Sequence, residues 1–194
     1  YIEHANALAA SIQQTQTTVN SISIITDNKK EVNKKLFKNV IKLKKDIAKG
    51  HSWKIHNRSQ FYNLSPYDET VILDADMLFL ESVDHWWDFF NKFDMLCTSK
   101  VKTYRGDWVV GSPYRKTFEA NALPNVYSAF TYFKKTELPN TVFDLMQYIV
   151  SNWNEWINRY APEEKQEVPS LDLALAIAIK ILQFSQIEIG RAHV

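Results

Sequence analysis

Apolar residues along this chain fall into short runs of strand type that alternate with longer stretches of helical spacing. The short β-branched or alternating runs predict strands at residues 21–26, 39–43, 70–73, 95–98 and 126–133, with an extended continuation at 77–80. The longer stretches predict helices at residues 5–15, 29–37, 53–64, 83–90, 136–156 and 171–183. Ser82 and Ser170 are expected N-caps, and residues 100–125 are expected to form a long loop. This alternation of strands and helices predicts an α/β sandwich.

Length, charge and cysteine content narrow the class of protein. The 194 residues suit one domain, and 45% hydrophobic residues supply a sizeable core. The formal net charge of +1 gives no reason to expect a nucleic-acid partner. No apolar run reaches the roughly 18 residues of a membrane span, and a single cysteine, Cys97, fits a reducing compartment, so we expect a cytoplasmic location.

Both ends of the sequence look unnatural. The chain begins at Tyr1, within what reads as a structural element, and residues 189–194 resemble the translation of a common sequencing adapter. We therefore expect a single domain over residues 1–188 that is incomplete at both ends. Residues 189–194 are expected to be a non-native tail.

Residues 29–49 contain nine lysines against two acidic residues, Glu31 and Asp46. Such a segment is either an ordinary solvated face or a patch that attracts an anionic acceptor or a phosphate. The sequence leaves both readings open.

Two aspartates, Asp74 and Asp76, directly follow the apolar run at residues 70–73. Ligands of open α/β sheets bind at the carboxyl ends of strands, and neighbouring carboxylates there need a neutralising partner. Mg²⁺ or Mn²⁺ meets that need and commonly bridges a diphosphate. In an extended segment both side chains would share one face. The alternative is a pair of turn aspartates with no ligand.

The stretch from Arg58 to Leu80, RSQFYNLSPYDETVILDADMLFL, resembles the core of the glycogenin-like glycosyltransferases. Arg58 lies sixteen residues before Asp74, where that family has a basic donor-contacting residue. Tyr62, Leu64 and Tyr67 fit the pattern without a gap, and the resemblance is good over about 35 residues.

The resemblance implies a Rossmann-like GT-A sandwich, with a mixed, mostly parallel sheet and helices on both faces. Asp74 and Asp76 would hold Mn²⁺ or Mg²⁺ on the diphosphate of a UDP-type sugar, with Arg58 adding positive charge and Lys54 sharing that role more weakly. The enzyme would transfer the sugar to an unknown acceptor. The family's third metal ligand, a histidine, would lie beyond Glu188, so residues 1–188 alone are expected to be inactive.

Two further positions match the family only in part. Ser128 agrees with its Asn-Ser-Gly pattern, whereas Tyr127 and Ala129 do not. Asp172 stands where the family has Asp-Gln, but Leu173 follows it. Ser128 is a candidate donor contact, and Asp172 is either a catalytic residue or a partner of the helix dipole.

Two other functions use the same residues. A haloacid-dehalogenase-type phosphatase would take Asp74 as nucleophile and Asp76 as general acid, although Leu78 departs from that motif. A non-catalytic carbohydrate-binding module would use both aspartates only as turn residues.

Overall fold

The computed structural model describes residues 1–18, 21–43, 45–48, 54–103, 105–109, 112–164 and 168–182, and the backbone of residues 187–191. The chain divides into two compact units, one formed by residues 1–46 and 73–92, the other by residues 47–72 and 93–194. Helices and strands occur in both, so the predicted mixed α/β class is confirmed.

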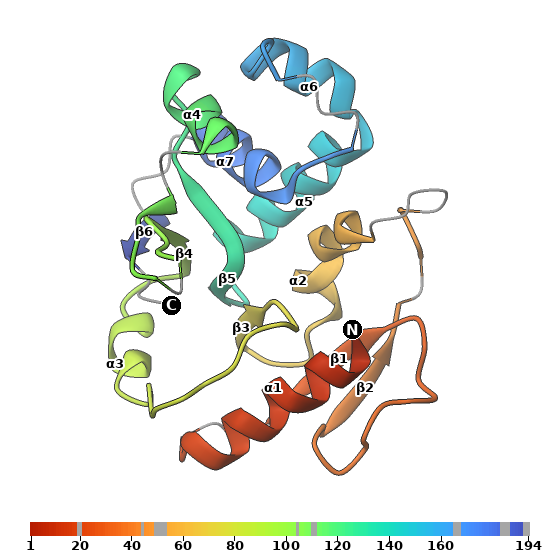
Figure 1. Cartoon of the computed structure of the whole chain (residues 1–194). Coiled ribbons are helices and arrows are strands. Elements are labelled where there is room, and N and C mark those ends of the chain that lie inside the picture. The colour runs from red at the N-terminus through yellow and green to blue at the C-terminus, as the bar shows by residue number, and fades with distance from the viewer. Residues whose placement is uncertain are drawn as a thin grey trace. The chain divides into compact units, whose positions relative to one another are not determined.

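The described residues of the first unit form two helices and a two-stranded parallel sheet (Figure 1). Its elements are α1 (Ile2–Thr15), β1 (Ser23–Thr26), β2 (Asn39–Lys42) and α3 (Trp86–Phe90). Ala9 of α1 packs with Val32 and Phe37 to form a small core.

A turn-rich connection joins β1 to β2, so the predicted helix at residues 29–37 is wrong. The Asn28 and Asn33 side chains accept hydrogen bonds from the backbone N–H groups of Lys30 at 3.0 Å and Lys35 at 3.2 Å. Such Asx turns compete with helix formation. Lys30 and Lys34 would also repel each other at helical spacing, which disfavours a helix further.

The second unit is built on a four-stranded mixed sheet in the order β3-β5-β4-β6. Its strands are β3 (Glu69–Leu73), β4 (Met95–Ser99), β5 (Val126–Lys134) and β6 (Ile187–Arg191). β4 runs antiparallel to β5 and parallel to β6. β6 includes positions 189–191 of the expected tail, and the non-native origin of residues 189–194 stays a prediction.

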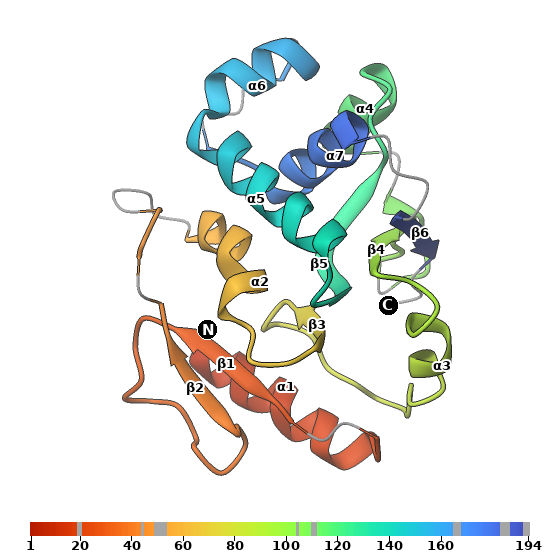
Figure 2. The same cartoon turned by 180° about the vertical axis from the view of Figure 1, so that it is seen from behind.

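The helices of the second unit supply most of its core. They are η1, a 3₁₀ helix (Ile55–Gln60), α2 (Phe61–Leu64), α4 (Pro113–Ala120), α5 (Glu137–Ser151), α6 (Trp153–Tyr160) and α7 (Leu171–Leu182). In α7, residues 173–179 are all buried, which marks a helix enclosed on every side. α5 and α7 lie side by side in both views (Figure 1 and Figure 2).

Three further predictions about helices and strands differ from the structure. The predicted helix at 136–156 is broken at Asn152 into α5 and α6, and α4 lies inside the expected loop at 100–125. The start of that helix is encoded by Ser112, whose hydroxyl accepts from the Arg115 N–H, and by Pro113 in the first turn. Residues 77–80 form no strand. Within the described residues, none of the helices combines the length and apolar character that crossing a bilayer requires.

Candidate functional site

The Asp74–Asp76 pair follows β3 directly, as expected, but the chain turns there. The Met77 N–H donates to the Asp74 carbonyl oxygen at 3.4 Å, so residues 74–77 form a turn. The extended backbone that was expected at this pair is therefore wrong, while the prediction that both carboxylates address one site stays a prediction. The Asp74 residue is half-buried and Asp76 is exposed, so the second carboxylate is open to solvent.

The segment after the pair is fastened to α1 within the first unit. The Phe79 N–H donates to the Ser11 hydroxyl at 3.0 Å. The Gln16 side chain donates to the Glu81 carbonyl at 2.9 Å and accepts from the Val83 N–H at 2.8 Å. These bonds fix the chain as it leaves the turn.

Asp84 completes this attachment. Its carboxylate accepts from the backbone N–H groups of Thr17 at 2.8 Å and Thr18 at 3.1 Å, and from both hydroxyls. The hydrogen bonds from Thr17 and then Thr18 hold the pKa of Asp84 well below its ordinary value. Val83 and Asp84 are thus bonded to the residues that directly follow α1. Helix α3 begins only at Trp86, and Ser82, which accepts from the Asp84 N–H, is not its N-cap.

In the second unit, a bulge in β5 frees the backbone around Ser128. The register with β4 passes from Cys97 opposite Thr131 to Thr98 opposite Tyr127, and so skips residues 128–130. Bulges redirect backbone and side-chain groups and are frequent beside active sites. Here the bulge releases the two peptide groups of Ser128 from pairing with β4.

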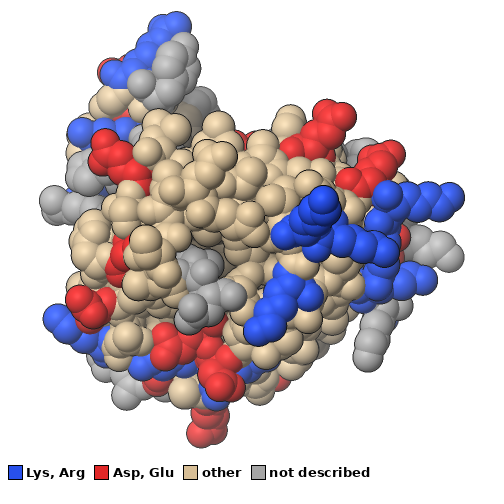
Figure 3. Space-filling view, turned by 90° about the horizontal axis from the view of Figure 1, so that it is seen from below, with Lys and Arg blue, Asp and Glu red and all other residues tan. Residues whose placement is uncertain are grey.

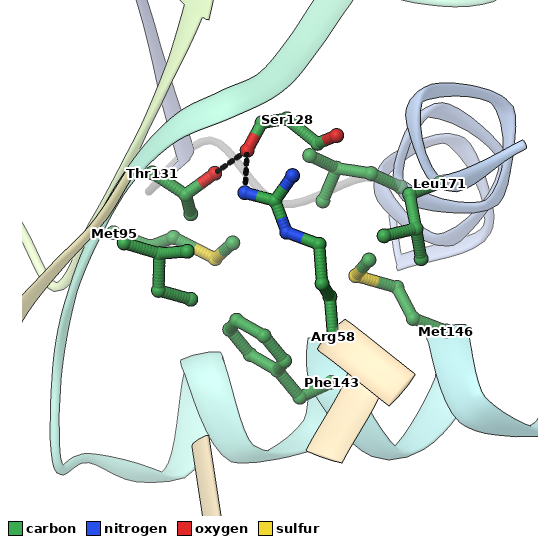
Figure 4. Close-up of a pocket in the computed structure, with 9 residues that line it drawn as sticks. Arg58, Met95, Ser128, Thr131, Phe143, Met146 and Leu171 are labelled. Carbon is green, nitrogen blue, oxygen red and sulfur yellow. Dashed lines mark hydrogen bonds between the residues drawn. The ribbon is translucent and has the colours of Figure 1, made fainter. Parts of the chain in front are cut away.

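Three residues that the sequence named as candidates meet at this bulge: Arg58 and Ser128 as donor contacts, and Asp172 as a catalytic residue or a partner of the helix dipole. The Ser128 N–H donates to Asp172 Oδ1 at 2.8 Å. The Ser128 carbonyl accepts from Arg58 Nη2 at 3.0 Å and from the Thr131 hydroxyl at 3.2 Å (Figure 4). Arg58 comes from η1, Ser128 from β5 and Asp172 from the first turn of α7, which Ser170 caps as predicted.

Arg115 belongs to this network and was missed by the sequence analysis. Its guanidinium forms an ion pair with Asp172 Oδ2, donates to the Val126 carbonyl at 2.6 Å, and lies 4.7 Å from the centre of the Tyr127 ring. The side chain is only 6% exposed. The Ser112-Pro113 helix start was a readable signal for α4, but nothing in the sequence joined Arg115 to Asp172, 57 residues away.

A small cavity adjoins Arg58 and Ser128. It measures about 20 Å³, which is room for one water molecule. Thr131 adds a polar group, while Ile72, Met95 and other apolar side chains form most of the wall (Figure 4). A space of this size does not hold a nucleotide sugar.

The other residues considered as donor or sugar contacts do not take part in the hydrogen bonds around Ser128 described above. Lys54 Nζ donates to the Ala48 carbonyl at 3.1 Å. Among the aromatic residues of the 100–125 segment, Tyr114 packs on Phe118 and bonds the Ser170 hydroxyl, and Trp108 is 46% exposed, with Lys102 over its ring. Tyr104 lies outside the described residues.

The described part of the chain contains no group of three His, Cys, Asp or Glu side chains arranged to hold a metal ion. The expected set has only two ligands, Asp74 and Asp76, with a third beyond Glu188. The two-ligand prediction is not tested by that observation.

The lysine-rich segment is exposed. All its described lysines face solvent: Lys29, Lys30, Lys34, Lys35, Lys38, Lys42 and Lys45. In the view from below, Lys and Arg side chains gather on the side where β1 and β2 lie in Figure 1 (Figure 3). Exposure fits both readings of this segment.

No protein-family model matches this chain, and no curated protein matches it significantly. The case for any function therefore rests on the residues and their geometry.

Proposed function

We propose that this chain is part of a metal-dependent glycosyltransferase of the GT-A type. Asp74 and Asp76 would bind Mn²⁺ or Mg²⁺ together with the diphosphate of a UDP-type sugar. The ion would supply the charge that stabilises the departing nucleoside diphosphate. Arg58 and Ser128 would contact the donor, and the sugar would pass to an acceptor that remains to be identified.

The observation that carries the proposal is the meeting of Arg58, Ser128 and Asp172 at the bulge of β5. The resemblance selected these residues from three separate parts of the sequence, and hydrogen bonds link them in the fold. β5 is the neighbour of β3, the strand that leads to the aspartate pair. A chance selection of residues 58, 128 and 172 gives no reason to expect such a link.

The turn at residues 74–77 is the observation that favours the alternative of a non-catalytic carbohydrate-binding module. Asp is a common first residue of such turns and needs no ligand there. Calorimetry separates the two functions. Metal-dependent binding of a nucleoside diphosphate supports the transferase, and metal-independent binding of free glycan supports the module.

The direct test of catalysis uses the full-length gene product, screened against nucleotide sugars for Mn²⁺-dependent hydrolysis. Asp74→Asn and Asp76→Asn should each lower the rate by at least about 100-fold, since even outer partners of metal ligands contribute about 10–100-fold. Asp27→Asn, an exposed aspartate of the first unit, is the matched control and should retain the rate. Unchanged rates in both site variants would remove the proposed centre.

A further inference from the structure

The Arg115 guanidinium is buried, and several hydrogen bonds and an ion pair fix its position. Its Nη1 donates to the Val126 carbonyl at 2.6 Å and to Asn125 Oδ1 at 3.2 Å, and its Nη2 pairs with Asp172. Three aromatic rings, those of Tyr114, Phe118 and Tyr127, lie within 5.1 Å of the guanidinium carbon. The planar fork of arginine suits several fixed acceptors at once.

Asp172 connects Arg115 to Ser128, the residue whose carbonyl oxygen accepts from Arg58. One carboxylate oxygen of Asp172 receives Arg115 and the other receives the Ser128 N–H. The carbonyl on the other side of Ser128 receives Arg58. Asp172 and Arg58 thus hold the two peptide groups that flank Ser128, and the bulge leaves this stretch without a register partner in β4.

We propose that Arg115 is a positioning residue, which acts through Asp172 and Ser128 to set the position of the Arg58 guanidinium. This assigns Asp172 the same kind of role, because both of its oxygens are occupied by protein donors. A buried ion pair adds little net stability compared with apolar packing, whereas it can specify one geometry. The effect on donor binding rests on the proposed function, but the effect on Ser128 does not.

Amide hydrogen exchange of the 194-residue chain, followed by NMR, tests the positioning directly. Arg115→Lys keeps the charge and loses the fork, so the Ser128 amide should exchange at least about tenfold faster. The Lys134 amide, which donates to the Asp94 carbonyl at 2.8 Å, is on the same strand and should keep its rate. Arg159→Lys, at an exposed arginine of the same unit, should leave both rates unchanged.

A role in overall stability alone gives a different result. In that case Ser128 and Lys134 would accelerate together, or Ser128 would not change, and either outcome overturns the proposal. If Arg115→Lys does not fold, Asp172→Asn repeats the comparison from the other side of the pair. The same selective acceleration of Ser128 is expected, and uniform acceleration again contradicts the proposal.

A second arm measures the affinity for UDP in the presence of Mn²⁺ by calorimetry. Arg115→Lys should weaken binding by roughly fivefold or more, and should add little once Arg58 is already Ala, because the two residues act through one contact. Full additivity of the two substitutions contradicts the proposal. If the wild type binds no UDP, the proposed function fails, and the exchange result still decides the role of Arg115.

Discussion

The Arg58 guanidinium donates to the Ser128 carbonyl oxygen at 3.0 Å, across 70 residues of sequence. The bulge of β5 makes this contact possible, because it leaves residues 128–130 outside the register with β4. The same carbonyl also accepts from Thr131. A basic side chain from η1 is thereby anchored beside the strand that neighbours β3.

The Arg115–Asp172 pair predicts a distinctive pattern of stability. Asp172→Asn should lower the free energy of unfolding by about 3 kcal/mol, since it leaves a buried guanidinium uncompensated. The double variant Arg115→Met with Asp172→Asn should lose less than the sum of the single losses. Urea unfolding followed by circular dichroism measures both.

Asp144→Asn is a suitable control for that comparison, because Asp144 is exposed on α5. It should change the free energy of unfolding by less than about 0.5 kcal/mol. Strict additivity of the Arg115 and Asp172 substitutions would show that the two side chains do not act as a pair.

The positions of helices and strands could be predicted from the sequence where the apolar pattern alone determines them. β3, β5 and α7 were expected close to their observed positions, because each is defined by its own apolar residues. The helix expected at 29–37 failed because Asn28 and Asn33 form turns with the backbone, a local competition that apolar spacing does not reveal. The break at Asn152 was not visible in the continuous apolar pattern of 136–156.

The sequence named three residues of the hydrogen-bond network around Ser128, but it did not predict the network itself. Arg58, Ser128 and Asp172 came from a family resemblance, whereas Arg115 needed the fold, because its partner lies 57 residues away. The register shift between β4 and β5 likewise depends on two strands together. Spacing along one strand does not encode it.

The Cys97 thiol should be unreactive towards alkylating reagents in the folded chain. It is buried, and burial, with a smaller contribution from the Asp172 charge, raises the pKa of the thiol to about 12 from 9.0. Iodoacetamide at pH 8.5 should therefore label Cys97 only after unfolding in urea. Rapid labelling of the native chain would contradict this environment.

The same shift predicts a loss of stability in alkali. The folded-state pKa lies above the unfolded value, so the contribution of Cys97 is fully present below pH 9.0 and is lost as the pH rises towards 12. Cys97→Ala should lose less stability than the wild type over that range. Thermal unfolding at several pH values compares the two, and parallel curves would exclude the effect.

The contribution of Asp84 to the stability of the folded chain should be largest near neutral pH. The folded-state pKa of its carboxyl lies below the ordinary value of 3.8, so its contribution is present above that value and is lost as the pH falls below it. Asp84→Asn should lower the melting temperature at pH 6, and the difference from the wild type should shrink in acid. Asp27→Asn is the control at an exposed aspartate of the same unit.

Amide exchange locates the effect of Asp84. The Thr17 and Thr18 amides donate to its carboxylate at 2.8 and 3.1 Å and should exchange faster in Asp84→Asn. Equal rates in Asp84→Asn and Asp27→Asn would mean that Asp84 does not hold the segment after the aspartate pair.

The central claim is that Asp74 and Asp76 bind a divalent ion against the diphosphate of a nucleotide donor. Its most direct measurement is the calorimetric affinity of the full-length gene product for UDP, with and without Mn²⁺, in the wild type, Asp74→Asn, Asp76→Asn and Asp27→Asn. The account predicts Mn²⁺-dependent binding that both site variants weaken by at least about tenfold and the control retains. Binding that is independent of Mn²⁺, or equal in all four proteins, would contradict it.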